Sequence, residues 1–497
     1  MPALSNATLT RLDPRIAMPR YDRQALTPGI VHIGVGGFHR AHQAMYLDEL
    51  MNCGQALDWG IVGVGVMTGD RRMQEALAAQ DHLYTLVVKH PSGEREPRVI
   101  GAMLDYLFAP DDPEAVIERM ADPAIRIVSL TVTEGGYNFH PVSGKFDLDN
   151  PDVRHDLGYP DTPRTAFGLV VEALVRRRER GLAPFTIMSC DNIQGNGEVA
   201  RRMFSAFARA RDTELGAWLE VEVPFPNAMV DRITPVTQPA DIEELMHEFG
   251  VEDAWPVVCE PFSQWVLEDR FVSGRPPLEQ AGVQVVEDVE PYELMKLRLL
   301  NASHQALCYF GTLAGYRYAH EVCRDPLFVD FLLGYMRREG SPTLSPVPGV
   351  DLEQYRLTLI ERFANPEIKD TLARLCAESS DRIPKWLVPV IREQLASGGE
   401  IHRSAGVVAS WARYAEGVDE QGEPIAVVDR LKNELMALAA ANRAQPTTFI
   451  DNRELFGDLA EHERFREAYL AALKSLHERG ARATLEALTG EQVQGAE

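Results

Sequence analysis

The stretch that decides the fold runs from residue 31 to residue 42 and reads VHIGVGGFHRAH. β-Branched residues precede its glycines, and a helix-like segment follows them. Gly34 suits a tight turn after a strand, and Gly36 lets the backbone approach a pyrophosphate where a helix begins. His39 replaces the usual third glycine of this fingerprint, which implies altered helix packing. The context predicts a nucleotide-binding turn, with a plain strand–helix turn as the alternative.

The residues after the first glycines are candidate neighbours of a cofactor. We expect the turn to be lined by Gly37, Phe38, His39 and Arg40. His39 and His42 are three residues apart, but no third metal ligand of suitable spacing accompanies them. They are therefore predicted to lie near phosphate or other polar groups, and no metal is expected.

A second predicted strand ends in residues 63–70, which read GVGVMTGD. An acidic residue at this place hydrogen-bonds the ribose hydroxyls of NAD and disfavours the 2′-phosphate of NADP. Asp70 is the candidate, although it lies farther from the glycines than usual. The neighbouring Arg71 and Arg72 weaken this discrimination, and a helix N-cap is an equally good role for Asp70. We expect NAD rather than NADP as the cofactor.

Short β-branched runs alternate with helical stretches in the first half of the chain, the pattern of a parallel sheet with crossover helices. We expect strands at residues 29–35, 59–66, 83–89, 125–131 and 184–190, and further strands near 97–107 and 219–225. After residue 285 nearly every periodic segment is helical. The sequence predicts an α/β chain with a doubly wound domain (1–285) and a mostly α-helical domain (286–497). The active site is expected in a cleft between them.

Composition narrows the class of function. The chain has 497 residues, too many for one ordinary core, and a formal net charge of −24. That charge repels a polyanion such as DNA, so no nucleic-acid partner is expected. No stretch approaches membrane-spanning length, and the six cysteines include no C-x-x-C pair. We expect a soluble cytoplasmic protein without a membrane partner or a thiolate zinc site.

A helix predicted over residues 293–314 carries polar side chains among apolar ones. In an α-helix, Lys296, Asn301 and His304 spread over an arc of about 140°. Alcohol oxidation needs a base for the hydroxyl proton and donors for the developing alkoxide, and a buried lysine and an asparagine amide can supply them. The alternative is a lysine that reaches the surface beside Glu293. Spacing alone leaves both interpretations open.

A polar loop at residues 189–197, SCDNIQGNG, follows another predicted strand. Loops at the carboxyl ends of such strands border the ligand crevice. Asn192 is therefore a candidate for a second oxyanion donor. A capping turn explains the same residues equally well, because Asn, Asp and Gly favour such turns for local reasons.

Several segments, in order along the chain, resemble the polyol-specific long-chain dehydrogenases. The matching stretches are GVGGFHRAH (34–42), TEGGY (133–137), SCDN (189–192), FPNAMVDRITP (225–235), WPVVCEPFSQWVLEDRF (255–271) and KLRLLNASH (296–304). The resemblance implies a Rossmann-type N-terminal domain and an α-helical C-terminal domain with the substrate-binding and catalytic groups. It also implies hydride transfer without zinc, and it favours a monomer.

The resemblance assigns roles to individual residues. It implies that Lys296 is the general base, that Asn192 and Asn301 form an oxyanion hole, and that His304 binds a substrate hydroxyl. Substrate-lining positions of this family fall on Val230, Asp231, Arg374 and Arg382. Arg382 stands where a lysine is expected, and Gly69 stands where some relatives carry an acidic residue beside Asp70.

The resemblance leaves several substrates open. It implies hydride transfer between NAD and a polyol–ketose pair, with mannitol and fructose as the leading pair. A fructuronate or other sugar-acid reductase, or an arabinitol or sorbitol dehydrogenase, is the alternative within the same chemistry. A nucleotide-sensing protein without turnover is a remote alternative, since the polar residues that suit catalysis argue against it.

Overall fold

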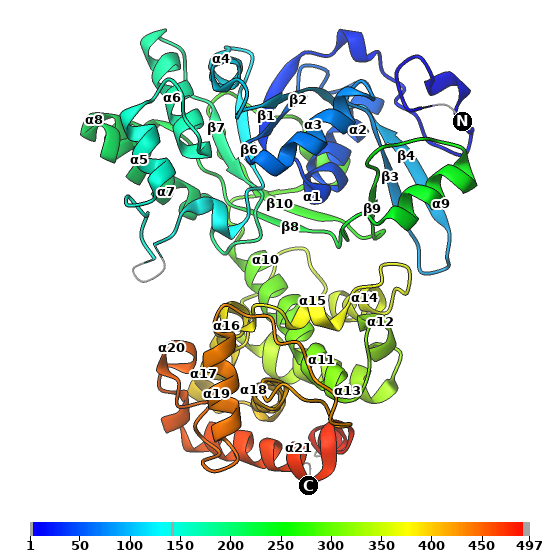
Figure 1. Ribbon diagram of the computed structural model, residues 1–497, viewed down its shortest axis with the longest axis vertical. Coiled ribbons are helices and arrows are strands. Elements are labelled where there is room, and N and C mark those ends of the chain that lie inside the picture. The colour runs from blue at the N-terminus through cyan, green and yellow to red at the C-terminus, as the bar shows by residue number, and fades with distance from the viewer. Residues whose placement is uncertain (1–2, 141–143, 491–497) are drawn as a thin grey trace. The chain divides into compact units, whose positions relative to one another are not determined.

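The computed structural model describes residues 3–140 and 144–490. It divides into two compact units, Met1–Glu290 and Pro291–Glu497. The first unit contains all the strands of the described residues, and the second is built from helices (Figure 1).

Five parallel strands form the main sheet of the first unit, in the order β5-β2-β1-β6-β7. The strands are β1 (Pro28–Ile33), β2 (Gly60–Gly65), β5 (Met103–Phe108), β6 (Ile127–Leu130) and β7 (Thr186–Ser189). From β1 the chain proceeds first to β2 and β5 on one side, and then returns to β6 and β7 on the other. The order therefore reverses between β1 and β6, and the residues that follow these two strands border the place where open parallel sheets bind ligands.

The central strands alternate their side chains between two buried cores. Ile30 of β1 packs into one core, while Val31 and Ile33 pack into the other. Successive residues of a strand point to opposite faces, so both faces of this sheet are covered. One core includes residues of α1 (Gly37–Ala41), α2 (Gln43–Asn52) and α3 (Arg71–Ala78); the other includes residues of α4 (Pro113–Ala121), α6 (Ala166–Glu179) and α7 (Asn196–Arg211). The predicted doubly wound fold is confirmed.

Two smaller sheets complete the first unit. One has the order β4-β3-β9, with β3 (Tyr84–Lys89), β4 (Arg95–Ile100) and β9 (Val257–Cys259). The other has the order β11-β10-β8, with β8 (Ala228–Asp231), β10 (Gln264–Glu268) and β11 (Gln284–Val286). The strand expected at 83–89 therefore forms, but outside the main parallel sheet. The remaining helices are α5 (Pro151–Gly158), α8 (Thr213–Glu222) and α9 (Pro239–Phe249).

The strand expected near 219–225 is wrong, because most of that run belongs to α8 and its end. Leu215 and Leu219 are four residues apart and both are buried, as one face of a helix requires. The Asp212 carboxylate caps the helix by accepting a hydrogen bond from the Leu215 amide at 2.8 Å. The run near 97–107 contributes to two strands, β4 and β5.

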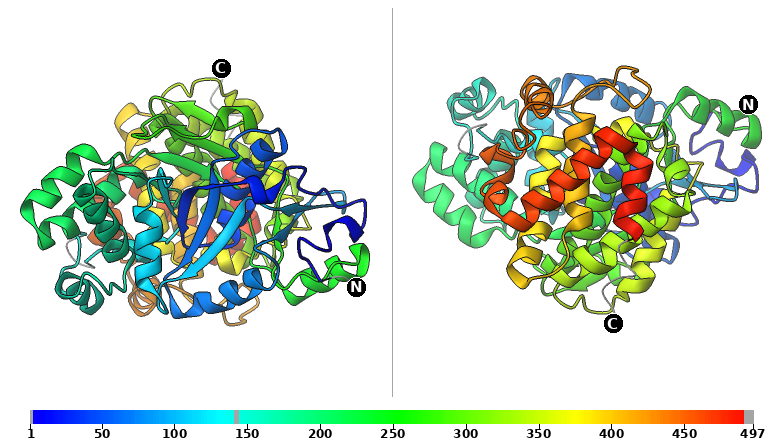
Figure 2. Two further views of the ribbon diagram at one scale, coloured as in Figure 1. Left: turned by 90° about the horizontal axis from the view of Figure 1, so that it is seen from above. Right: turned by 90° about the horizontal axis from the view of Figure 1, so that it is seen from below.

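The second unit forms no β-strand among its described residues, 291–490. Its helices are α10 (Glu290–Met295), α11 (Ala302–Leu313), α12 (Ala319–Val322), α13 (Pro326–Tyr335), α14 (Leu352–Phe363), α15 (Leu372–Cys376), α16 (Ser379–Trp386), α17 (Val388–Ser397), α18 (His402–Tyr414), α19 (Lys432–Ala441), α20 (Arg453–Phe456) and α21 (Glu463–Gly490). A π-helical segment, Lys296–Asn301, joins α10 to α11. The buried helix α18 packs against α11 and α21 (Figure 2). The predicted helical second half is confirmed.

Within residues 3–140 and 144–490, no helix is both long enough and apolar enough to cross a membrane. All six cysteines are free thiols. Cys53 is exposed, and the other five are buried.

Candidate active site

The turn after β1 brings its backbone against the neighbouring strand. Gly34 has φ +92°, and a Cβ built on it would lie 2.3 Å from the Thr131 carbonyl oxygen, just beyond β6. Only glycine fits there. Gly36 has φ −121°, and the nearest atom to an added Cβ is the Gly34 carbonyl oxygen at 3.9 Å. The backbone at Gly36 therefore has room beside it, and Gly37 and Phe38 are partly exposed next to that space.

His39 and Arg40 lie behind this turn. Each is about 1% exposed. The His39 ring stacks on His32 of β1 with a centroid separation of 3.4 Å. Arg40 donates from Nη1 to the Trp255 carbonyl oxygen, and its guanidinium lies 5.2 Å from the centre of the Tyr84 ring. The two side chains support the turn from within the protein, and their nearest partners are polar groups of the protein, namely the His32 ring and the Trp255 carbonyl.

A buried polar network joins His32 to the glycine turn. Nδ1 of His32 lies 2.8 Å from Ser129 Oγ, and Nε2 of His32 lies 2.9 Å from Thr131 Oγ1. The Thr131 hydroxyl in turn donates to the Gly34 carbonyl oxygen. Burial lowers the pKa of His32 to about 3 and the pKa of His39 well below its usual value. Both rings are therefore neutral near pH 7. The nearby His42 contacts the Gln264 carbonyl oxygen through Nε2 at 2.9 Å.

Asp70 closes its own turn after β2. Its Oδ2 accepts hydrogen bonds from the amides of Val66 and Met67, both at 2.9 Å. Arg71 forms a two-bond ion pair with Asp111 at 3.0 and 2.6 Å. Arg72 lies over the Trp255 ring at 4.6 Å. Asp70 thus accepts hydrogen bonds from amides that precede it and, among the described residues, makes no side-chain cap hydrogen bond to α3. Both arginines have protein partners.

Asp191 ties together the loops that follow β6 and β7. Its Oδ1 accepts from the Thr133 amide at 2.7 Å, and its Oδ2 accepts from the Tyr137 hydroxyl at 2.8 Å and the Val132 amide at 3.2 Å. Thr133 has φ +63°, a strained conformation for a β-branched residue. Burial raises the pKa of Asp191, and these hydrogen bonds oppose that rise. The Asp191 carboxylate helps to hold this strained turn, because it accepts the hydrogen bond from the amide of Thr133 itself.

The next residue, Asn192, is exposed at the surface of this loop. Val230 and Asp231 end strand β8, where they lie opposite Trp265 and Gln264 of β10. Both are buried, at 4% and 5% exposure. Asn192 therefore directly follows the residue that joins the two loops, whereas Val230 and Asp231 are held by the pairing of β8 with β10.

The polar helix of the second unit is interrupted by a π-helical turn. The Ala302 amide donates to the Leu297 carbonyl oxygen, five residues earlier. Residues five apart in such a turn lie nearly above one another, so Lys296 and Asn301 face the same side. The expected 140° arc, which assumed a regular α-helix, is therefore too wide. Lys296, Asn301 and His304 are 7%, 6% and 8% exposed.

Two features of this helix suit a polar ligand. Within the described residues, the buried Oδ1 of Asn301 accepts no hydrogen bond. A buried amide of this kind is costly unless something binds it, and its two ends are interchangeable by rotation. The His304 ring packs against Phe363 at a centroid distance of 4.5 Å, which fixes its orientation.

Arg374 and Arg382 lie close together on successive helices. Arg374 forms a two-bond ion pair with Asp370, both contacts at 2.6 Å, and its side chain is 58% exposed. Arg382 donates from Nη1 to the Leu375 carbonyl oxygen at 2.9 Å, and its guanidinium lies 5.7 Å from the Trp386 ring. The structure thus gives Arg382 a capping role at the end of α15.

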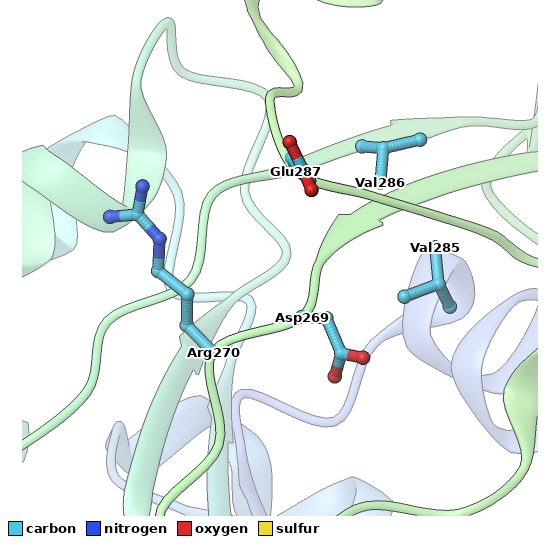
Figure 3. Close-up of a pocket in the computed structure, with 5 residues that line it drawn as sticks. All are labelled: Asp269, Arg270, Val285, Val286 and Glu287. Atoms are coloured by element: carbon cyan, nitrogen blue, oxygen red, sulfur yellow. The ribbon is translucent and has the colours of Figure 1, made fainter.

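A hollow of about 410 Å³ lies elsewhere in the first unit (Figure 3). It is lined by Asp269, Arg270, Val285, Val286 and Glu287. Asp269 and Arg270 follow β10 at the end away from Gln264, the residue opposite Asp231. None of the predicted site residues lines this hollow. In residues 3–140 and 144–490, no group of three or more His, Cys, Asp or Glu side chains is arranged to hold a metal ion.

Three residues with structural roles were absent from the predicted set: Asp191 and Thr133 at these loops, and Arg298 in the π-helical segment, where its guanidinium binds the Glu393 carboxylate. Asp191 and Thr133 stand inside the motifs SCDN and TEGGY, so their positions were visible but their contact was not. Arg298 is a charge within an otherwise apolar run, LRLL. A buried arginine needs partners, and this pattern was the available indication.

Two family models together match most of the chain. The mannitol dehydrogenase Rossmann domain matches residues 28–280, and the mannitol dehydrogenase C-terminal domain matches residues 288–477. The chain belongs to the mannitol dehydrogenase family. The Rossmann-type and helical domains expected from the sequence are confirmed by these matches.

Relatives in this family cover nearly the whole chain. A mannitol 2-dehydrogenase from Aspergillus fumigatus is 48% identical over 477 residues, which is 95% of each chain. The structure of Pseudomonas fluorescens mannitol 2-dehydrogenase, a ternary complex with NAD and D-mannitol, is 46% identical with a TM-score of 0.89, covering 99% of this chain and 100% of that one. A D-sorbitol dehydrogenase in substrate-free form is 40% identical with a TM-score of 0.91, covering 97% and 100%.

Proposed function

We propose that this protein is an NAD-dependent polyol dehydrogenase that interconverts D-mannitol and D-fructose. The observation that carries the proposal is the full-length similarity to mannitol 2-dehydrogenases, one of them solved with NAD and D-mannitol. The buried polar set on one helix, Lys296, Asn301 and His304, supplies groups that suit this chemistry. The reaction oxidises the C2 hydroxyl of the polyol to the ketone of the ketose.

The first unit fits a dinucleotide at the turn after β1. Gly34 allows the close approach of the turn to β6, and Gly36 leaves room beside its backbone. Gly36, Gly37 and Phe38 would hold NAD there, and His39 and Arg40 would support them from behind. Asp70 follows β2, where discrimination of the ribose hydroxyls is expected. When bound, NAD accepts the hydride from the carbon that is oxidised.

The proton of the substrate hydroxyl passes to Nζ of Lys296 in this proposal. The neutral amine of Lys296 is the form that acts as a base. Amide N–H groups of Asn192 and Asn301 donate to the alkoxide oxygen as its charge develops. His304 binds a neighbouring hydroxyl, and Val230, Asp231, Arg374 and Arg382 contribute to the recognition of the polyol.

The division of labour follows the two domains expected from the sequence. We assign cofactor binding to residues 1–285, and the base and most substrate contacts to residues 286–497. We propose that the enzyme acts as a monomer in the cytoplasm. Six free thiols suit a reducing compartment.

A panel of substrates tests the function. Purified full-length protein is assayed for NAD reduction with mannitol, sorbitol and arabinitol, and for NADH oxidation with fructose and fructuronate, each with NADP(H) in parallel. We expect the highest kcat/KM with mannitol and fructose and with NAD(H). Binding of NADH without turnover of any of these substrates would reject the proposal in favour of a nucleotide-sensing protein.

D-Sorbitol is the second candidate substrate, because the D-sorbitol dehydrogenase resembles this chain over its full length. Mannitol and sorbitol differ only in configuration at C2, so both yield fructose when oxidised at that carbon. The product of fructose reduction therefore separates the two candidates. Chromatography of the polyol formed from fructose and NADH gives mannitol in the first case and sorbitol in the second.

A further inference from the structure

The helix with Lys296 and Asn301 is held from behind by residues outside the predicted site. All six residues of the π-helical segment Lys296–Asn301 are buried. A π-turn is rare, because it places an extra residue in a helix at the expense of regular bonding. Contacts from neighbouring elements are therefore needed to hold this one in register.

Arg298 provides the first of these contacts. It follows Lys296 by two residues, roughly half a helical turn, so it leaves the helix on the opposite side. Its guanidinium binds both carboxylate oxygens of Glu393 on α17, at 2.8 and 2.7 Å. It also donates to the Thr343 carbonyl oxygen at 2.5 Å. The Arg298 side chain is 9% exposed, so the guanidinium end of these bonds is shielded from solvent.

The backbone of the π-turn is held as well. Tyr335 is fully buried at the end of α13, and its hydroxyl donates to the Arg298 carbonyl oxygen at 2.9 Å. A second π-helical segment, Met336–Gly340, follows Tyr335 directly. A Cβ added to Gly340 would lie 2.9 Å from Leu299 Cδ2 and 3.3 Å from the Arg298 carbonyl oxygen. Glycine at 340 thus permits the close approach that brings the Tyr335 hydroxyl within reach.

We propose that Arg298, held by Glu393, Thr343 and Tyr335, is a positioning residue that keeps Lys296 and Asn301 on one side of the π-turn. If this turn relaxed to a regular α-helix, the two side chains would diverge toward the 140° separation of residues five apart. The base and the oxyanion donor would then no longer act on the same oxygen atom. The proposal rests on the proposed function, because it takes Lys296 and Asn301 to be the reacting groups.

Three conservative variants test this clamp in the full-length enzyme. Tyr335→Phe removes one hydroxyl, Glu393→Gln removes the charge that pairs with Arg298, and Arg298→Lys keeps the cation but loses the two-bond geometry. Glu461→Gln is the matched control, because it breaks an exposed arginine ion pair of the same unit, with Arg453. We expect kcat for mannitol oxidation to fall about 10-fold in Tyr335→Phe and Glu393→Gln, since small misplacements of reacting groups are costly.

Further measurements distinguish positioning from simple stabilisation. The Kd for NADH is expected to stay within about twofold of wild type, and the pH profile of kcat is expected to shift, because the surroundings of Lys296 change. Arg298→Lys should retain more activity than Arg298→Met. If the variants lower the melting temperature but keep the wild-type kcat and pH profile at 25 °C, the clamp only stabilises the fold and the proposal is overturned.

Hydrogen exchange separates failure of the clamp from failure of the proposed function. Amides of residues 296–302 should exchange faster in Tyr335→Phe and Glu393→Gln than in wild type or Glu461→Gln. If the wild-type protein oxidises no polyol, the proposed function fails, and unchanged exchange in the variants would overturn the clamp independently. If wild type is active and Lys296→Ala is not, a lower kcat in the clamp variants supports the clamp, and a wild-type kcat overturns it.

Discussion

Alanine substitutions at Gly34 and Gly36 should have opposite consequences, although the two glycines are only two residues apart. Gly34→Ala forces a side chain into φ +92°, at about 1–2 kcal/mol. It also places a methyl group 2.3 Å from the Thr131 carbonyl oxygen, so the turn must move away from β6. Such overpacking costs about 1–3 kcal/mol. We expect a total loss of roughly 3–4 kcal/mol and a melting temperature lowered by roughly 10 °C.

Gly36→Ala should leave the stability of the free protein unchanged, because the nearest atom to the new methyl group lies at 3.9 Å. The methyl group instead occupies the space assigned to the pyrophosphate, so we expect the Kd for NADH to rise at least about tenfold, or 1.4 kcal/mol. Thermal unfolding without ligand and titration of NADH fluorescence measure the two effects. Gly158→Ala is the control, since no atom lies within 4 Å of its added Cβ.

Two results would refute this reasoning. A Gly34→Ala protein that melts within about 2 °C of wild type would mean that the approach of the turn to β6 is not needed. A Gly36→Ala protein that binds NADH like wild type would mean that the pyrophosphate does not lie beside Gly36.

Other predictions concern the base, the cofactor, the pH and metal removal. Lys296→Ala should lower kcat for mannitol oxidation by about 10³-fold while NADH still binds, and a loss below tenfold would reject Lys296 as the base. Asp70→Ala should raise the NADP-to-NAD ratio of kcat/KM, whereas an unchanged ratio would leave Asp70 only its turn-closing role. Because burial depresses the folded pKa of His32 to about 3, only the unfolded chain takes up a proton on this ring between about pH 6.5 and pH 3, so the free energy of unfolding falls by up to about 1.4 kcal/mol per pH unit in that window. Urea unfolding at pH 7 and pH 5 should therefore show a loss in wild type that exceeds that of His32→Gln by roughly 2 kcal/mol. Prolonged incubation with EDTA should leave mannitol oxidation unchanged, since Lys296 supplies the base; a loss that zinc restores would contradict this.

The parallel sheet and the helical half could be predicted because their determinants are local. The alternation of Ile30 with Val31 and Ile33 reflects burial on both faces, and such runs identify strands before any contact is known. The pairing of strands cannot be predicted in this way, because it depends on segments that are far apart in the sequence. Residues 83–89 form a strand as expected, but β9 pairs with it from far along the chain, so it joins another sheet.

The candidate site was predictable in its residue types and not in its geometry. Lys296, Asn301 and His304 were identified by polarity within an apolar helix, but a helical wheel assumes 3.6 residues per turn and cannot show a π-turn. Likewise, the position of His39 in the glycine motif suggested a place near phosphate or other polar groups, without saying which. Its burial against His32 depends on the packing of β1 and α1, which no local pattern reveals.

The strand pair β3–β9 also has a consequence for how the chain folds while it is being synthesised. The Asp253 carboxylate just before β9 accepts a hydrogen bond from Gln80, 173 residues earlier, and another from the Thr85 amide of β3. During synthesis, the strands β1, β2, β5, β6 and β7 can assemble once residue 189 has left the ribosome, but the edge of β3 stays open until residues 257–259 follow. An unpaired strand edge is an aggregation hazard. A chain that stalls between residues 190 and 256 would therefore present the complete main parallel sheet beside a β3–β4 pair whose β3 edge is unpaired, and that edge would be prone to aggregation.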